Sequence, residues 1–388
     1  MKNKLNIWSL GDNRLMEIMK LDEKRSEYLT ALKGLATIMV LIVHTGAGSL
    51  PDIFGEIGND GARGVQLFFV ISGILAFRSL DTFFHDRKIT IKGILHWYLK
   101  KYYRLAPLYY LAIIVSMLTA SWSPWWLGSE GHVTLKNMIA HIFLLHGLVP
   151  HYTDSVLYIE WYIGVLWIFY LLSPWIFWVI NSFEKSVIFT MMVYLINPFL
   201  KKGLATIFPV DHDSYIYNEF LSNFGPLNQI LVFCFGIILY YAILRIQDKQ
   251  YNNKYISSML LILSLIWLFC LIDGGDCILR LTRNEMFGLC FAILILSQAI
   301  HSSKIVCNSF FMLMGKYSYG IYLFQFFLLK HYDKYIRDNG YLEWFSRFII
   351  CLIAFTGIAV ILDKLYEKPL NKIINNHIRN KKEYERKK

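Results

Sequence analysis

Residues 33–44 read KGLATIMVLIVH, an apolar run that opens on a lysine and ends on a histidine eleven positions later. On an α-helix, eleven residues rise about 16 Å and turn through about 1,100°, so Lys33 and His44 lie on nearly the same face. A histidine inside an apolar run is costly unless it meets a polar cavity or a polar partner. The pair is therefore a candidate site, although a histidine that only bonds a neighbouring helix fits this position equally well.

Apolar runs of this kind recur along the chain and decide its class. Of the 388 residues, 56% are hydrophobic and 16% are aromatic, and the mean hydropathy is +0.41. Soluble domains contain about 45–50% apolar residues. Here the apolar residues gather in long uncharged runs, and about 18 or more such residues are enough to cross a bilayer. We therefore predict an all-α, polytopic membrane protein embedded in the lipid bilayer.

Ten runs are expected to form transmembrane helices, and one shorter run is not. The ten lie near residues 31–50, 64–80, 103–121, 157–180, 186–200, 226–244, 255–272, 285–300, 309–329 and 346–366. The run at 136–149 is about 14 residues long, which suits an interfacial or re-entrant helix better than a span. The transmembrane domain is then residues 28–370, between an N-terminal tail (1–27) and a basic C-terminal tail (371–388).

Basic residues indicate the orientation of these helices. The formal net charge is +11, and most of it falls in the two tails and in short loops such as residues 78–101. An even number of spans places the tails on one side, and the excess of lysine and arginine makes that side cytoplasmic. We expect a multi-pass protein of the cell membrane with both termini in the cytoplasm. The charge then gives no indication of a nucleic-acid partner.

The start of the second predicted span carries three polar groups. Residues 61–73 read GARGVQLFFVISG, with Arg63, Gln66 and Ser72 among small and apolar residues. The glycines permit close approach of another helix. Arg63 and Gln66 are candidates for the mouth of a cavity. Ser72 is a candidate for its interior, or bonds only its own helix.

The start of the third predicted span carries two cations one helical turn apart. In residues 100–110, KKYYRLAPLYY, Lys101 and Arg104 share a face at i, i+3. One interpretation is that they anchor the span on its cytoplasmic side. The other is a clamp in which a guanidinium fork and an ammonium bind the phosphates of an anionic nucleotide such as coenzyme A.

Several segments together resemble the acyltransferase-3 family of integral membrane O-acyltransferases, of the envelope polysaccharide O-acetyltransferase type. They are residues 32–34 with His44, 64–73, 101–110, 161–174, 315–323 and 366–369. Their order and spacing resemble the family over roughly residues 27–370. The resemblance implies ten spans, a cytoplasmic acyl-CoA donor and transfer to a carbohydrate.

The resemblance also implies site residues. The family's arginine-x10-histidine motif maps onto Lys33 and His44, and its arginine-x-x-arginine motif onto Lys101 and Arg104. In both motifs the first arginine is lysine here, which keeps the charge but loses the bidentate fork. Recognition of a planar phosphate group then falls on Arg104.

Two further positions depart from the family pattern. Leu166 stands where many members carry a glutamate, and Gln325 stands where a histidine is common. Glu160 lies six residues before Leu166 and cannot simply replace the missing carboxylate. It remains, with the polar groups of residues 61–73, a candidate contact to the cavity or to the acceptor. The pattern resembles the branch that modifies polysaccharides or lipid-linked glycans.

The prediction is thus a membrane O-acyltransferase that moves an acyl group, normally acetyl, from acyl-CoA to a carbohydrate hydroxyl. His44 acts as general base on that hydroxyl or accepts the acyl group transiently, and Lys33 assists. Acyl-CoA is a co-substrate, and we expect no bound cofactor and no metal ion. The alternative is a transporter or flippase for a glycan or small solute, in which His44 relays protons. Inverted repeats with broken helices would favour it, and the sequence has none that is clear.

Overall fold

A computed structural model of the protein describes residues 26–84, 87–119, 133–207, 214–274, 281–332, 340–370 and 372. The helices are α2 (Glu27–His44), α3 (Asp52–Asp60), α4 (Gly64–Phe83), α5 (Ile91–Leu118), α6 (Leu135–Ile142), α7 (Trp161–Val179), α8 (Phe183–Ile207), α9 (Ser214–Glu219), α10 (Pro226–Asp248), α11 (Lys254–Ile272), α12 (Arg283–Ile300), α13 (Ser309–Lys316), α14 (Ser318–Tyr332) and α15 (Tyr341–Leu362). The described residues contain no β-strand, so the predicted all-α class is confirmed. The two expected tails lie almost wholly outside these ranges.

Eight helical stretches in the described part of the chain are long and apolar enough to cross a membrane. They are Glu27–His44, Asp52–Phe83, Trp161–Val179, Phe183–Ile207, Tyr217–Asp248, Lys254–Ile272, Arg283–Ile300 and Tyr341–Leu370. The other two expected spans are helical as well, in a different form. The third contains α5, 28 residues long, with a basic first half. The ninth is divided into α13 and α14, which meet at Tyr317.

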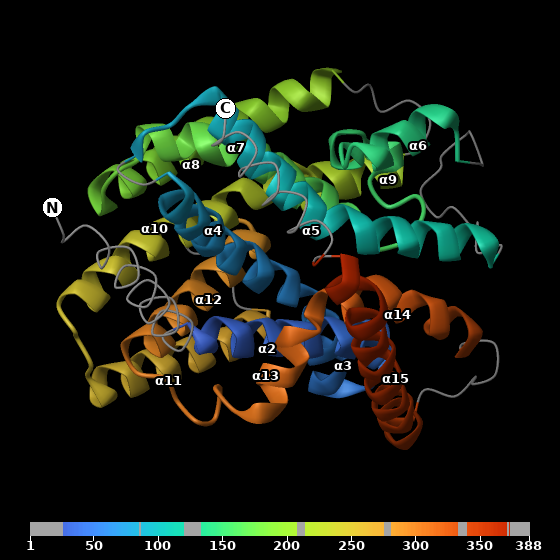
Figure 1. Cartoon of the computed structure of the whole chain (residues 1–388). Helices are drawn as coiled ribbons and strands as arrows, with labels where there is room; N and C mark the ends of the chain where they lie inside the picture. Colours follow the sequence, from blue (N-terminus) through green and yellow to red (C-terminus); the bar gives the residue numbers. More distant parts are fainter. Residues whose placement is uncertain are drawn as a thin grey trace, which may run out of the picture.

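The centre of the bundle is formed by α2, α4, α10 and α12, which pack against one another. Glycines allow the backbones to touch there: a Cβ on Gly73 of α4 would lie 2.4 Å from the carbonyl oxygen of Phe233 in α10. In Figure 1, α8 and α11 lie at opposite edges of this group. Apolar side chains of α8 and α11 are exposed, for example Met191 at 61% and Ile262 at 57%. Such surfaces suit contact with lipid.

The short run at 136–149 does not span the bilayer as a helix, as expected. It contains α6, eight residues long, followed by a short 3-10 turn at His146–Leu148. Eight residues of α-helix measure about 12 Å, well short of the roughly 30 Å hydrocarbon layer. Asn137, His141 and His146 are all 0% exposed, so one face of this segment is buried within the protein, while Leu135, Phe143 and other apolar side chains are exposed.

Candidate functional site

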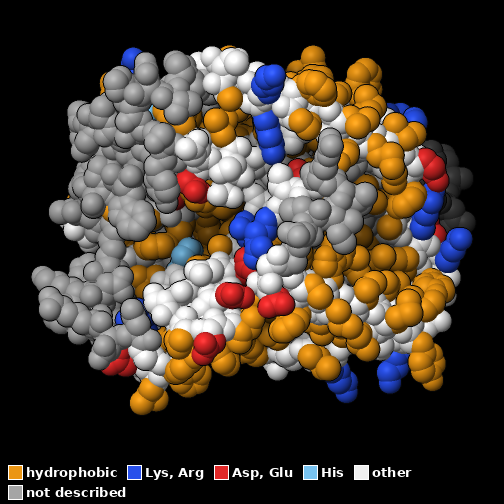
Figure 2. All heavy atoms as spheres, turned by 180° about the vertical axis from the view of Figure 1, so that it is seen from behind, with side chains coloured by type: hydrophobic (Ala, Val, Ile, Leu, Met, Phe, Trp, Pro, Cys, Tyr) orange, Lys and Arg blue, Asp and Glu red, His pale blue; other side chains and the backbone are white. Residues whose placement is uncertain are grey.

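A cavity of about 280 Å³ opens where α2, α4, α5, α7 and α14 converge. Its lining residues are Lys33, Phe68, Ile71, Ser72, Leu75, Lys101, Tyr103, Arg104, Leu105, Pro107, Leu108, Tyr162, Leu166, Tyr170, Lys316, Ser318, Tyr319, Tyr322, Glu367 and Leu370. The structure therefore brings together three predicted cations and Ser72, from helices far apart in the sequence. Figure 2 shows the face opposite to Figure 1, where charged side chains gather near a hollow with hydrophobic walls.

Among the described residues, four cations line this cavity against a single carboxylate, that of Glu367. Arg104 is exposed and Lys101 is 6% exposed, so one lies toward solvent and the other in the interior. The Lys101 ammonium lies 5.0 Å from the ring centre of Trp97 and 5.1 Å from that of Tyr170, within the range of a cation–π contact. No described carboxylate forms an ion pair with Lys33, Lys101 or Lys316, which leaves these charges available to an anion.

Hydroxyl groups form the other polar wall of the cavity. The Ser72 and Tyr162 hydroxyls are 3.2 Å apart, and Tyr170 lines the same cavity. Ser72 thus serves the cavity and not only its own helix. Tyr319 donates to the Leu105 carbonyl oxygen at 2.7 Å, so its ring is fixed at the edge of the cavity.

His44 lies at the far end of α2 and is not part of the cavity lining. Eleven residues of helix separate it from Lys33, a rise of about 16 Å. Its ring centre is 4.8 Å from that of Phe326, its side chain lies beside that of Gln325, and its buried Nδ1 has no hydrogen-bond partner among the described residues. Gln325 follows Tyr322 by one turn on α14 and donates to the Tyr322 carbonyl oxygen. One helical turn of α14 therefore connects the cavity with His44.

Arg63 and Gln66 belong to a different polar cluster at the start of α4. Arg63 lies 3.6 Å from Asp60 and donates to Asn284 of α12. Gln66 donates to Gln229 at 3.2 Å and to Asn284 at 3.3 Å. The structure thus places these two candidates between α4, α10 and α12, and it does not bring them to the cavity.

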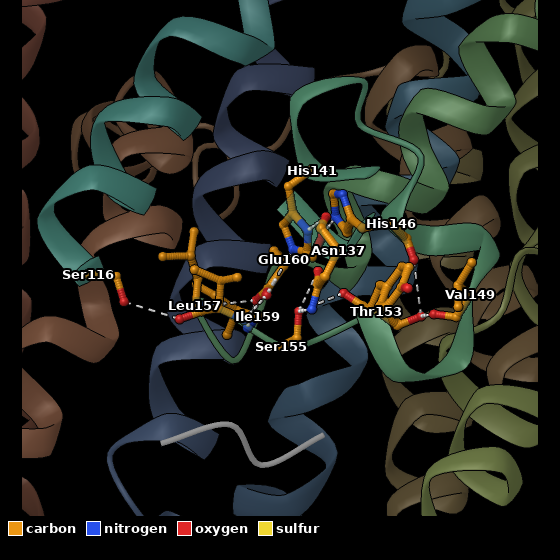
Figure 3. A network of polar contacts seen from close by, with 12 residues as sticks. Ser116, Asn137, His141, His146, Val149, Thr153, Ser155, Leu157, Ile159 and Glu160 are labelled. Carbon is orange, nitrogen blue, oxygen red and sulfur yellow. Dashed lines mark hydrogen bonds and ion pairs between the residues drawn. The ribbon is translucent and has the colours of Figure 1, made fainter. Parts of the chain in front are cut away.

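Glu160 also lies away from the cavity lining, in a buried cluster with His141 and His146 (Figure 3), and the buried Asp154 is close to it. Its carboxylate accepts main-chain hydrogen bonds and lies 3.5 Å from His141 Nε2. Burial, together with the nearby His141, lowers the pKa of His146 to about 3. Burial, together with the Glu160 carboxylate, raises the pKa of Asp154 well above its usual range.

Sequence reasoning missed Lys316 and the tyrosines as members of the site. Lys316 follows Gly315, just as Lys33 precedes Gly34. This mirrored order of glycine and lysine is the signal present in the sequence. In the structure Gly34 and Gly315 are in backbone contact, which brings both lysines to the cavity. Nothing local distinguishes Tyr170 or Tyr322 from the other tyrosines in apolar runs.

A family model described as an acyltransferase domain, of the acyltransferase-3 type, matches residues 26–364. The matched range includes nearly all residues that line the cavity, and His44. Comparisons with curated proteins and with solved structures give no match. Because the family match covers most of the chain and the helices are long and apolar, the protein belongs to the acyltransferase-3 family and is a membrane acyltransferase.

Proposed function

We propose that this protein is an O-acyltransferase that moves an acyl group, acetyl in the first instance, from acyl-CoA to a hydroxyl of an envelope polysaccharide or lipid-linked glycan. The observation that carries the proposal is the cavity with four cations and one carboxylate. Coenzyme A bears a pyrophosphate and a further phosphate. A ligand with that charge needs several cations and few carboxylates around it.

The four cations of the cavity contact different parts of acyl-CoA in this proposal. Arg104 supplies the planar fork that binds a phosphate through two parallel hydrogen bonds. Lys33 and Lys316 come from the adjacent helices α2 and α13 and add point charges. Each charge-assisted hydrogen bond contributes about 1.5–3 kcal/mol. Lys101, packed on aromatic rings, lies deeper and meets the part of the donor nearer the thioester.

The donor enters from the cytoplasm. The first half of α5, which leads to the cavity, carries Lys92 and Lys100 as well as the two cavity cations. Lysine and arginine are enriched in the cytoplasmic loops of membrane proteins. Acyl-CoA is made and held in the cytoplasm, so the basic end of α5 lies on the side of the membrane where the donor is found.

The chemical step requires a base, because a sugar hydroxyl is a poor nucleophile at neutral pH. The His44 imidazole removes the hydroxyl proton while the oxygen bonds the acyl carbon. The carbon–sulfur bond breaks, and coenzyme A leaves as a thiolate that takes a proton from the imidazolium. In the alternative route, a ring nitrogen of His44 first takes the acyl group from sulfur and then yields it to the hydroxyl.

The separation between the cavity and His44 suits the shape of the donor. The phosphates of coenzyme A are joined to the thioester by the extended pantetheine arm. With the phosphates at Lys33 and Arg104, this arm runs along α2 toward His44, about 16 Å away along the helix. The unpartnered Nδ1 of His44 supports a role in proton transfer.

The proposal is tested with purified protein in lipid nanodiscs, using radiolabelled acetyl-CoA and a glycan extract. We expect saturable acetyl-CoA binding and release of free coenzyme A. Glycans from cells with and without the protein are then compared by mass spectrometry, and we expect a difference of one acyl group per modified unit. Glycan movement without acetyl-CoA consumption would identify a transporter and overturn the proposal. Absence of both binding and acylation would also overturn it.

A further inference from the structure

We propose that Glu160 is a positioning residue for acyl transfer: its carboxylate fixes the buried turn of residues 156–160, which holds the face of α14 that joins the cavity to His44. The role in catalysis rests on the function proposed above. A chain of contacts begins at Glu160 and ends at His44.

The Glu160 carboxylate holds its own turn together. It accepts hydrogen bonds from the main-chain N–H groups of Val156, Leu157 and Ile159, the last two at 2.9 and 3.1 Å. Three N–H donors favour the ionised form of a carboxylate. Glu160 is 0% exposed, so no solvent replaces a bond that is lost. Three main-chain N–H groups of the turn therefore depend on this one side chain.

The Glu160 carboxylate lies beside two buried histidines, His141 and His146 (Figure 3). The Nδ1 of His141 donates to the Asn137 carbonyl oxygen at 2.9 Å, which leaves Nε2 facing the Glu160 carboxylate. His146 stacks on His141 at 4.4 Å and donates from Nε2 to the Glu160 carbonyl oxygen at 2.9 Å. Burial and the Glu160 carboxylate raise the pKa of the Asp154 carboxyl well above its usual range. Removing the Glu160 carboxylate leaves buried main-chain N–H donors unsatisfied, which is destabilising.

Two consecutive residues of the turn contact α14. The Ile159 carbonyl oxygen accepts a hydrogen bond from the Tyr322 hydroxyl. Tyr158 stacks on Phe326, with ring centres 6.0 Å apart. Tyr322 and Phe326 are four residues apart and share one face of the helix. The turn thus fixes α14 at two adjacent points.

These two points reach the two parts of the site. Tyr322 lines the cavity, and the Phe326 ring packs on His44 at 4.8 Å. Tyr158 adopts a left-handed backbone with φ of 70°. That conformation is unfavourable for a residue other than glycine, and such strain persists where the surroundings fix it. The neighbouring N–H groups held by Glu160 provide that restraint.

The first experiment separates positioning from stability by steady-state kinetics on purified, nanodisc-embedded variants. Glu160→Gln keeps the shape but turns one acceptor oxygen into a donor. We expect kcat to fall by about tenfold or more, since a misplacement of about 1 Å can cost about a hundredfold, while the KM for acetyl-CoA stays within about twofold. Glu285→Gln is the matched control, because Glu285 is also buried and bonds a main-chain N–H, at the start of α12. We expect wild-type kcat for it.

Tyr322→Phe removes only the hydroxyl that bonds Ile159 and keeps the ring. This milder variant tests the same contact even if Glu160→Gln fails to fold. We expect a lower kcat, and we expect the double variant with Glu160→Gln to be no slower than the slower single variant. Additive effects, or a wild-type kcat for a folded Glu160→Gln variant, would overturn the proposal. A raised acetyl-CoA KM with unchanged kcat would assign the turn to donor binding and overturn it as well.

A second measurement does not depend on acyl transfer. Diethyl pyrocarbonate modifies accessible imidazoles, and peptide mass spectrometry gives the rate at His44. We expect this rate to rise by about threefold or more in Glu160→Gln, because the ring loses its fixed contact with Phe326, and to stay unchanged in Glu285→Gln. An unchanged rate in Glu160→Gln contradicts the positioning role. A changed rate in a protein that transfers no acyl group would sustain the positioning role and reject the proposed function.

Discussion

Gly34 of α2 and Gly315 of α13 lie backbone to backbone. A Cβ on Gly34 would be 1.9 Å from the Phe311 carbonyl oxygen, and a Cβ on Gly315 would be 1.7 Å from the Thr30 carbonyl oxygen. Only glycine allows this approach. Each glycine has a lysine beside it, so the contact that packs two helices also places two charges at the cavity.

Gly34→Ala should therefore damage both folding and the cavity. The added methyl group meets backbone, which cannot rotate away, and overpacking of this kind costs about 1–3 kcal/mol or more. We expect a lower melting temperature, measured by thermal unfolding in one detergent. Gly203→Ala in α8 is the control, because no atom lies within 4 Å of its new Cβ. There alanine should be neutral or stabilise by about 0.5–1 kcal/mol. Equal melting temperatures for the two variants would contradict the close contact.

The local part of the site could be predicted from the sequence, and the long-range part could not. Helical periodicity placed Lys33 and His44 on one face, and α2 does contain both as one helix. The same reasoning paired Lys101 with Arg104. Such predictions need only the geometry of one helix.

Two features required information from outside one segment. Lys316 joins the cavity because α13 crosses α2 at glycines 281 positions apart, and a single sequence does not reveal such a pairing. Glu160 precedes α7 by one residue, yet its side chain points into a buried turn and not into the cavity. The direction of a side chain at a helix start depends on the preceding loop, which helical periodicity does not describe.

Arg104→Ala should raise the KM for acetyl-CoA by about ten- to a hundredfold, because a charge-assisted bond to phosphate contributes about 1.5–3 kcal/mol. Arg104→Lys should restore part of the loss, since a point charge replaces a fork. The control is Arg245→Ala, an exposed arginine paired with Glu184 outside the cavity. Superimposable acetyl-CoA titrations for Arg104→Ala and wild type would place the donor elsewhere.

Lys316→Ala should also weaken acetyl-CoA binding, and the effect should depend on salt. Lys316 is exposed at the cavity, so dissolved ions screen its charge, with a Debye length of about 10 Å at 0.1 M salt. We expect the difference in Kd from wild type to shrink as salt rises, measured by equilibrium binding of labelled acetyl-CoA. Lys304→Ala removes another exposed lysine outside the cavity lining and should leave the Kd unchanged. A Lys316→Ala variant that binds like Lys304→Ala at every salt concentration would remove Lys316 from the donor site.

His44→Ala should abolish acyl transfer while acetyl-CoA still binds. The two effects separate because His44 lies outside the cavity, which keeps its four cations in this variant. Loss of the base removes proton abstraction, and general-base catalysis contributes about 10²–10⁴-fold to the rate. Lys33→Arg is the companion variant and should keep activity, because it retains the charge at the cavity and adds a fork. Equilibrium binding and single-turnover transfer, measured on the same preparation, check both expectations. Transfer near the wild-type rate in His44→Ala would show that the imidazole serves only to pack against Phe326. If the Kd for acetyl-CoA rises as transfer is lost, His44 belongs to the donor site instead.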